Sequence, residues 1–344
     1  MNDLQAGEGR QEVLVGRDLV KHFHSGSPAS RRKVHAVDGV SLSLRAGEVL
    51  GIVGESGCGK STLGRMLVGL ERPTSGTLVY HGRDVTRGRR RDRQWLRKGV
   101  QMIFQDPYTS LDPRMTVADI IAEPLAAAHV GTARSRRERV VELLELVGLS
   151  KDMLHRYPHQ FSGGQRQRLG IARALALEPD VLVCDEAVSA LDVSVQAQVV
   201  NLLKDLQARL GVAMVFIAHD LGVVHHIADQ VAVMYLGHIV ETGSVEAIYA
   251  APAHPYTQAL LSASPTVDLS NRGVLGRRRI LGGEPPSPLD PPSGCRFRTR
   301  CWLAEERCAE EVPLLRRPTT DTHGLQVACH FAERAQVEAN ADAR

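Results

Sequence analysis

The stretch from Glu48 to Ser61 reads EVLGIVGESGCGKS and joins an apolar run to a glycine-rich loop. Residues 48–53 are predicted to form a buried strand that ends at Gly54. Residues 60–70 then have helical spacing, with one apolar side formed by Leu63, Met66, Leu67 and Leu70. The loop between strand and helix fits the G-x-x-x-x-G-K-[ST] pattern without a gap. This order of elements predicts a phosphate-binding loop.

Each residue type in this loop has a chemical reason to be there. Glycines let backbone N–H groups point inward around a phosphate without obstruction by a Cβ atom. The helix that begins near Lys60 directs the positive end of its dipole at the anion. We expect the Lys60 ammonium to reach the β- and γ-phosphates of ATP and the Ser61 hydroxyl to ligate Mg²⁺. Cys58 is interpreted as a small filler. The residues predicted to surround the phosphates are Gly54, Glu55, Ser56, Gly57, Cys58, Gly59, Lys60, Ser61 and Thr62.

Two carboxylates end a second apolar run, VLVCDE, at Asp185 and Glu186. The carboxyl end of a strand is where α/β sheets bind ligands. We expect Asp185 to hold Mg²⁺ and Glu186 to act as the general base that orients and polarises the attacking water. His219 and Gln105 each follow another apolar strand. His219 is predicted to contact the γ-phosphate, and Gln105 to join the metal shell and sense the nucleotide state.

The wider pattern predicts an α/β fold. Strands alternate with helices, which favours a largely parallel sheet, and the helical stretch from about Thr116 to Ala176 reads as an inserted lobe. The basic segment from Arg87 to Arg93 is predicted to be a solvated loop, with contact to an anionic membrane surface as the alternative. The 344 residues suffice for two domains, or for one large domain with appendages.

Composition limits the function classes. The net charge of +3 is too small to suggest nucleic-acid binding. No segment approaches the roughly 20 apolar residues that span a bilayer. The N-terminus, MNDLQAGEGRQE, is polar and lacks an apolar signal segment. We therefore expect a chain that stays in the cytoplasm and does any membrane work through partner chains.

The segment from Phe161 to Arg168, FSGGQRQR, is similar to the signature sequence of ABC-type ATPases. The resemblance implies a RecA-like P-loop core with an antiparallel β subdomain and an inserted α-helical subdomain. It assigns Phe23 to adenine stacking and Asp192 to the nucleotide site. It implies that the signature covers the γ-phosphate of ATP held by a second subunit, through Ser162, Gly163, Gly164 and Gln165. Ala187 departs from the pattern, because many relatives have proline after the glutamate.

A narrower resemblance runs along nearly the whole chain. The stretches FQDPYTSLDPRMTVADIIAEPL, HPYTQALLSASP and PPSGCRFRTRC resemble ATP-binding subunits of dipeptide and oligopeptide importers, most of all the second of the two ATPases. This implies a paralogous ATPase partner, two transmembrane permease subunits and an extracytoplasmic substrate-binding protein. It also implies a peripheral position on the cytoplasmic face of the inner membrane. Nickel or another small solute as cargo, and a soluble ABC ATPase, remain alternatives.

The end of the chain differs in composition, being rich in proline, glycine and arginine. We predict a disordered N-terminus over 1–11, an ABC ATPase domain over 12–265 with its helical subdomain at about 116–176, a separate C-terminal extension over 266–335 and a disordered tail over 336–344. The extension contains four cysteines, Cys295, Cys301, Cys308 and Cys329. Thiolates in a proline-rich module with little core of its own suggest a metal staple. Zn²⁺, an iron–sulfur cluster and free thiols all remain open, and the family resemblance implies a [4Fe–4S] cluster.

Overall fold

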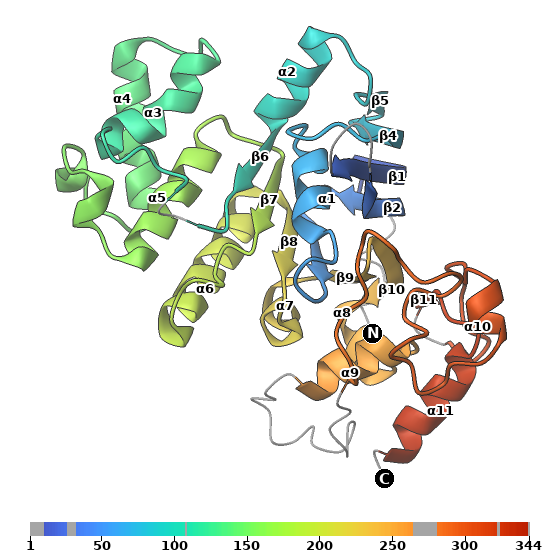
Figure 1. The fold of residues 1–344 in the computed structure, drawn as a ribbon. Helices are drawn as coiled ribbons and strands as arrows, with labels where there is room; N and C mark the ends of the chain where they lie inside the picture. The colour runs from blue at the N-terminus through green and yellow to red at the C-terminus, as the bar shows by residue number, and fades with distance from the viewer. Residues whose placement is uncertain (1–9, 26–31, 107–108, 264–280, 322–323, 343–344) are drawn as a thin grey trace.

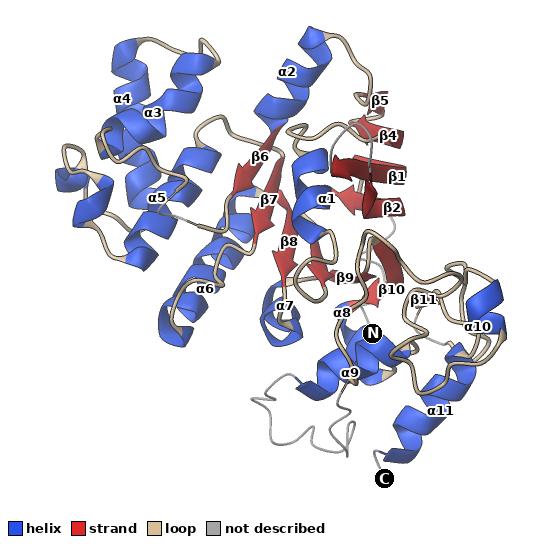
Figure 2. Cartoon of the chain, viewed as in Figure 1, coloured by secondary structure: helices blue, strands red, loops and turns tan. Residues whose placement is uncertain are grey.

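The computed structural model describes residues 10–25, 32–106, 109–263, 281–321 and 324–342 (Figure 1). Within these ranges, two β-sheets pack on either side of helix α1 (Lys60–Leu67), which contacts strands of both. A helical lobe lies at one end of the larger sheet and a C-terminal extension at the other (Figure 2). None of the helices in the described ranges is both long enough and apolar enough to cross a bilayer.

The larger sheet has seven strands in the order β11-β10-β9-β3-β8-β7-β6. Its bounds are β3 (Val49–Val53), β6 (Val100–Ile103), β7 (Val181–Asp185), β8 (Ala213–Ala218), β9 (Gln230–Tyr235), β10 (His238–Ser244) and β11 (Gln326–Val327). The strands from β9 to β6 run parallel, whereas β10 and β11 are antiparallel additions. Every residue of β3, β7 and β8 is buried, as expected for strands covered on both faces. The predicted parallel α/β core is thus confirmed.

The smaller sheet is antiparallel, in the order β2-β1-β4-β5. Its strands are β1 (Glu12–Ser25), β2 (Arg32–Arg45), β4 (Ser75–Tyr80) and β5 (Arg83–Asp84). Its inner residues, such as Leu14, Leu44 and Leu78, share one apolar core with Leu63 and Met66 of α1. Burying these side chains fixes the helix that follows the phosphate loop between the two sheets.

The helical lobe contains α3 (Val117–Ala127), α4 (Ala133–Leu146), the 3₁₀ turns Lys151–Met153 and Pro158–Gln160, and α5 (Gly163–Leu175). Val117, Leu143 and Leu169 from these helices belong to a core that continues onto the far face of the large sheet. Two further helices, α6 (Val193–Leu210) and α7 (Leu221–Ile227), connect the strands of that sheet.

The basic segment Arg87–Arg93 was expected to form a solvated loop, and this expectation is wrong for its second half. Helix α2 spans Arg90–Gly99. The Asp92 carboxylate accepts a hydrogen bond from the Arg89 N–H at 2.8 Å, which caps the helix start. Leu96 anchors the helix in the core between the sheets. A capped start and one buried leucine are thus enough to form a helix here, although most of the other residues are charged.

The C-terminal extension is not a separate module, because it completes the edge of the large sheet. It follows α8 (Val245–Ala250) and α9 (Pro255–Ala263), and it contains α10 (Arg307–Glu310), β11 and α11 (Ala332–Asp342). Strand β11 pairs with β10, and Phe297 and Leu325 belong to the main core. The tail predicted to be disordered from residue 336 is helical as far as Asp342. Most of the disordered start predicted over 1–11 lies outside the described residues.

A buried carboxylate ties β10 to the start of α9. Glu241 is wholly buried and accepts hydrogen bonds from the N–H groups of Ala253 at 2.6 Å and His254 at 3.0 Å. Burial raises the pKa of Glu241 to about 7, although bonds from Thr257 and the two N–H groups act against this shift. Since an unpaired buried N–H is costly, the carboxylate determines where α9 begins.

We therefore predict that Glu241→Gln destabilises the protein. The amide places an NH₂ donor against backbone N–H donors, which should cost about 1–3 kcal/mol and lower the melting temperature by several degrees. Thermal unfolding followed by circular dichroism tests this. Glu306→Gln, at an exposed position, is the matched control. Equal melting temperatures for Glu241→Gln and the wild type would show that the carboxylate does not anchor α9.

Candidate active site

The phosphate loop lies between the end of β3 and the start of α1. Two of its glycines are required by close backbone contacts. A Cβ atom on Gly54 would lie 2.1 Å from the Met234 carbonyl oxygen, and one on Gly59 would lie 2.0 Å from that of Ala36. Gly59 also has φ +107°, which L side chains rarely adopt. At these two glycines the loop therefore packs tightly against strands of both sheets, β9 and β2.

Lys60 is held at the opening of this loop. Its side chain is 3% exposed, and Nζ donates hydrogen bonds to the carbonyl oxygens of Gly54 at 2.7 Å and Glu55 at 2.9 Å. The same Nζ lies 3.8 Å from Oε1 of Glu186. The lysine is thus positioned by loop carbonyls on one side and faces a carboxylate on the other, where a terminal phosphate would carry negative charge.

Ser61, at the start of α1, contacts Asp185, at the end of β7. The Ser61 Oγ donates a hydrogen bond to Asp185 Oδ1 at 2.8 Å. Asp185 is buried at the end of β7, and burial raises the pKa of this carboxyl group while the Ser61 hydrogen bond lowers it. A hydroxyl and a carboxylate at this separation are the hard oxygen ligands that Mg²⁺ prefers. The two predicted metal ligands therefore lie close enough together to share one cation.

Glu186 has a strained backbone. Its φ is +45°, a left-handed value that is uncommon outside glycine. Main-chain bonds hold it there, since the Glu186 N–H donates to Ile217 O at 3.0 Å and its carbonyl accepts from the Ser189 hydroxyl at 3.0 Å. Its Oε2 accepts a hydrogen bond from Gln105 Nε2 at 2.8 Å. Nothing in the sequence indicates this conformation, which directs the Glu186 side chain toward both Lys60 and Gln105.

Other predicted residues lie around this centre without direct contact to the loop. His219 is exposed at the end of β8, beside β3 and β7. Phe23 lies on β1 in the other sheet and is 37% exposed, with Lys21 Nζ 4.9 Å from its ring centroid. An exposed aromatic face is available for stacking on a base.

The signature residues lie on the helical lobe, and within the described ranges their hydrogen bonds stay inside the lobe and do not reach the phosphate loop. Ser162 caps α5, because its Oγ accepts from the Gln165 N–H at 3.3 Å and Gln165 Oε1 accepts from the Ser162 N–H at 3.1 Å. A Cβ atom on Gly164 would lie 2.5 Å from Val195 at the start of α6. Gly163 faces Leu191 in the same region. This edge is therefore a rigid, outward-facing helix start.

Asp192 caps the neighbouring helix α6. Its Oδ1 accepts hydrogen bonds from the Val195 N–H at 2.9 Å and the Ser194 hydroxyl at 2.8 Å. These bonds hold the pKa of Asp192 below its ordinary value. The residue after it, Val193, is 84% exposed, which is unusual for a valine. This segment lies beside the signature, since Val195 of α6 lies against Gly164.

The four cysteines of the extension lie near one another. Burial raises the pKa of Cys301 and of Cys329 to about 12, and the other thiols of the group raise each further. The Cys295 N–H donates to the Cys308 carbonyl at 2.8 Å, which joins two of the four along the backbone. A second group of possible ligands is His22, His35 and Asp38. In this group the Arg296 guanidinium donates a hydrogen bond to the Asp38 carboxylate, so a positive charge already occupies the place that a metal ion would take.

Comparisons with known proteins agree with this arrangement. A family model described as ABC transporter matches residues 37–189, and one described as oligopeptide/dipeptide transporter, C-terminal region, matches residues 240–308. The chain is 50% identical to the oligopeptide transport ATP-binding protein AppF of Bacillus subtilis, over 94% of this chain and 98% of AppF. It is 52% identical to the dipeptide transport ATP-binding protein DppF of Haemophilus influenzae, over 92% and 96% of the two chains.

Among solved structures, the chain resembles the dimeric post-hydrolysis state of the ATP-binding cassette MJ0796 bound to ADP and phosphate. The TM-score is 0.61 at 27% identity, covering 67% of this chain and 98% of that one. It also resembles cbiO1 of Clostridium perfringens, with a TM-score of 0.60 at 28% identity, over 70% and 91% of the two chains. The chain therefore belongs to the ABC transporter ATP-binding proteins, in the family of oligopeptide and dipeptide transport ATPases.

Proposed function

We propose that this chain is the ATP-hydrolysing subunit that powers an importer of dipeptides or oligopeptides. The observation that carries the proposal is the cluster of Lys60, Ser61, Asp185, Glu186 and Gln105 at one edge of the sheet, linked by hydrogen bonds and one close ion pair. The names of the relatives support peptides as the cargo.

In this function, N–H groups of the loop bind the phosphates, and Lys60, resting on the loop carbonyls, reaches the β- and γ-phosphates. Ser61, Asp185 and Gln105 would hold Mg²⁺, which supplies positive charge to the transferring phosphoryl group. Glu186 accepts the proton of the attacking water, and the Gln105 hydrogen bond keeps its carboxylate in place. His219, at the neighbouring strand end, would contact the γ-phosphate.

One chain supplies only half of each catalytic site. The residues Ser162 to Gln165 lie on the helical lobe, away from this chain's own phosphate loop (Figure 1). We propose that they cover ATP held by a paralogous ATPase, and that this chain's ATP is covered in return. A helix start with glycine N–H groups is suited to a γ-phosphate, so ATP would join the two subunits and hydrolysis would release them.

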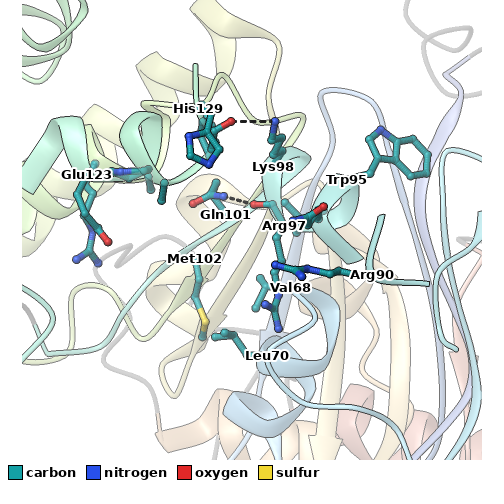
Figure 3. A pocket seen from close by; sticks show the side chains of 18 of the residues that line it. Val68, Leu70, Arg90, Trp95, Arg97, Lys98, Gln101, Met102, Glu123 and His129 are labelled. Carbon is teal, nitrogen blue, oxygen red and sulfur yellow. Dashed lines mark hydrogen bonds between the residues drawn. The ribbon is translucent and has the colours of Figure 1, made fainter. Parts of the chain in front are cut away.

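The permease partners need a docking place, and a groove beside the helical lobe fits that role. It has a volume of about 970 Å³ and lies between α2, β6, α3 and α5 (Figure 3). Trp95 and Phe104 are exposed along it. Phe104 directly precedes Gln105 in the chain. A segment of a transmembrane partner bound here would therefore sense the residue that contacts Glu186. In this proposed function the subunit lies at the cytoplasmic face of the inner membrane, and the permeases receive cargo from an extracytoplasmic binding protein.

We also propose that the four cysteines hold a [4Fe–4S] cluster. Among the described residues, His22, His35 and Asp38 are the group whose ligand atoms all lie within 4.8 Å of one another. No three sulfur atoms of the four cysteines lie as close together as that. Tetrahedral zinc, with Zn–S bonds of about 2.3 Å, would bring its sulfurs within about 4 Å of one another. Four cysteine thiolates are the ligand set of a [4Fe–4S] cluster, so the proposal rests on the ligand type and on the family resemblance.

We predict that Glu186→Gln removes turnover but keeps ATP binding. Loss of the general base should lower kcat at least 100-fold, by the usual magnitude of about 10²–10⁴ for such groups. The variant should trap a dimer with the partner ATPase in the presence of ATP, visible by size-exclusion chromatography. Glu145→Gln, on the exposed face of the helical lobe, is the control. Near-normal ATPase activity of Glu186→Gln in the assembled transporter would remove Glu186 from this role.

The cargo is tested by transport. The chain, its paralogous ATPase and both permeases are placed in vesicles together with the binding protein, and uptake of a labelled dipeptide is measured with ATP on the side of the ATPases. We expect uptake that depends on ATP and disappears with Glu186→Gln. Uptake of a nickel complex or another solute in place of peptides would contradict the peptide assignment but leave the ATPase intact.

The cluster is tested by colour and metal content. Anaerobically purified protein should be brownish, with absorption near about 400 nm from thiolate-bound iron, and Cys301→Ser should lose most of it. Cys184→Ala, in β7 and outside the group, should keep it. Colourless wild-type protein that contains zinc would show the cluster assignment to be wrong.

A further inference from the structure

The segment from Cys295 to Cys301, CRFRTRC, reaches the phosphate loop. Between the two cysteines, the side chains of Arg296, Phe297 and Arg300 contact residues of the ATPase core. Phe297 is buried against Tyr235 and Tyr256, with ring centroids 5.2 and 5.4 Å away. The segment is therefore anchored in the core and its two arginines are fixed relative to the sheet.

Arg300 forms a bidentate salt bridge with Glu55, the second residue of the phosphate loop. Its two terminal nitrogens donate to the two carboxylate oxygens of Glu55, at 2.7 and 3.1 Å. The Arg300 side chain is 6% exposed and that of Glu55 is 27% exposed. A bidentate pair that is largely screened from water is among the stronger charged contacts in proteins. An isolated surface pair of this kind would contribute little.

The main chain of Glu55 links the Arg300–Glu55 salt bridge to Lys60. The Glu55 N–H donates to the Tyr256 hydroxyl at 2.8 Å, so a residue of α9 holds the same position from another direction. The Glu55 carbonyl accepts from Lys60 Nζ at 2.9 Å. A shift of Glu55 would therefore move the carbonyl on which the lysine rests.

Arg296 holds the opposite side of the loop through a turn. It donates to the Leu236 carbonyl and to the Asp38 carboxylate. The Gly237 N–H, next in the chain, donates to the Cys58 carbonyl in the middle of the loop at 2.8 Å, and the Gly237 carbonyl accepts from the Asp38 N–H at 2.9 Å. The loop is thus supported at Glu55 and at Cys58 by arginines of one seven-residue segment.

We propose that this cysteine-bounded segment is a brace of the phosphate loop, in which Arg300 is a positioning residue that sets the affinity for ATP by fixing Glu55 and, through it, Lys60. The proposal rests on the ATP site proposed above. It assigns the extension a direct part in nucleotide binding, beyond that of a structural staple. Arg300 itself touches neither phosphate nor metal, so its removal should weaken binding more than it slows the chemical step.

The test is a double-mutant cycle on the full-length chain. Binding of trinitrophenyl-ATP with Mg²⁺ is measured by fluorescence for the wild type, Arg300→Ala, Glu55→Ala and the double variant. We expect Arg300→Ala to raise the Kd about tenfold. The double variant should be no weaker than the worse single one, because both remove the same contact. Arg300→Lys should recover part of the affinity. In the assembled transporter, KM for ATP should rise by a similar factor while kcat falls less.

Arg298→Ala is the matched control, because this arginine of the same segment donates to the Ser293 carbonyl instead of the loop. Its Kd should stay within about twofold of the wild type. If Arg300→Ala does not fold, Glu55→Gln tests the pair from the loop side and should raise the Kd.

An unchanged Kd for Arg300→Ala, strictly additive effects in the cycle, or an equal loss for Arg298→Ala would each overturn the brace. Wild-type protein that binds no trinitrophenyl-ATP would instead contradict the ATP site itself.

Discussion

The register of three parallel strands brings the chemistry of this protein together. Val53 at the end of β3 pairs with Ala218 at the end of β8, and Asp185 at the end of β7 pairs with Ile217. The chain therefore leaves all three strands within one residue of the same level of the sheet. Gly54, Glu186 and His219 are the next residues in each case. A one-residue slip of β7 would reverse the sides of Asp185 and Glu186, so the buried apolar faces of these strands fix the site as well as the core.

The parts of the site that could be predicted from sequence are those encoded locally. A glycine-rich loop between an apolar strand and a helix has few other interpretations, and a carboxylate at a strand end has a known place in α/β sheets. The strand Gln230–Tyr235 and the helix 193–210 also agree with their apolar periodicity. Helix α2 was missed because its residues are mostly charged and its one apolar core residue, Leu96, gives no period.

The contacts that sequence could not predict join distant residues. Arg300 and Glu55 are 245 positions apart, and neither has a neighbour pattern that points to the other. The left-handed backbone of Glu186 is equally hidden, because it depends on a hydrogen bond to Ile217 in another strand. Ala187 follows Glu186 at the position where the family resemblance implies proline in many relatives. The bonds to Ile217 and Ser189 hold Glu186 in place without a rigid ring after it, and Ala187 is simply buried.

Lys60 and Glu186 are contacted from the two sides of the molecule, Glu186 from the helical-lobe side and Lys60 from the side of the C-terminal extension. Gln105, beside the groove of the helical lobe, contacts Glu186, whereas Glu55, held by the C-terminal extension, contacts Lys60. The two charged groups lie 3.8 Å apart in a site that is mostly shielded from water, where their interaction is stronger than at an open surface. In the proposed function, a phosphate entering the loop would compete with Glu186 for the Lys60 ammonium and would free the Glu186 carboxylate to polarise water. In that function, a displacement of either side would change the balance of this one pair, and so a permease partner and the extension would both act on hydrolysis without touching the nucleotide.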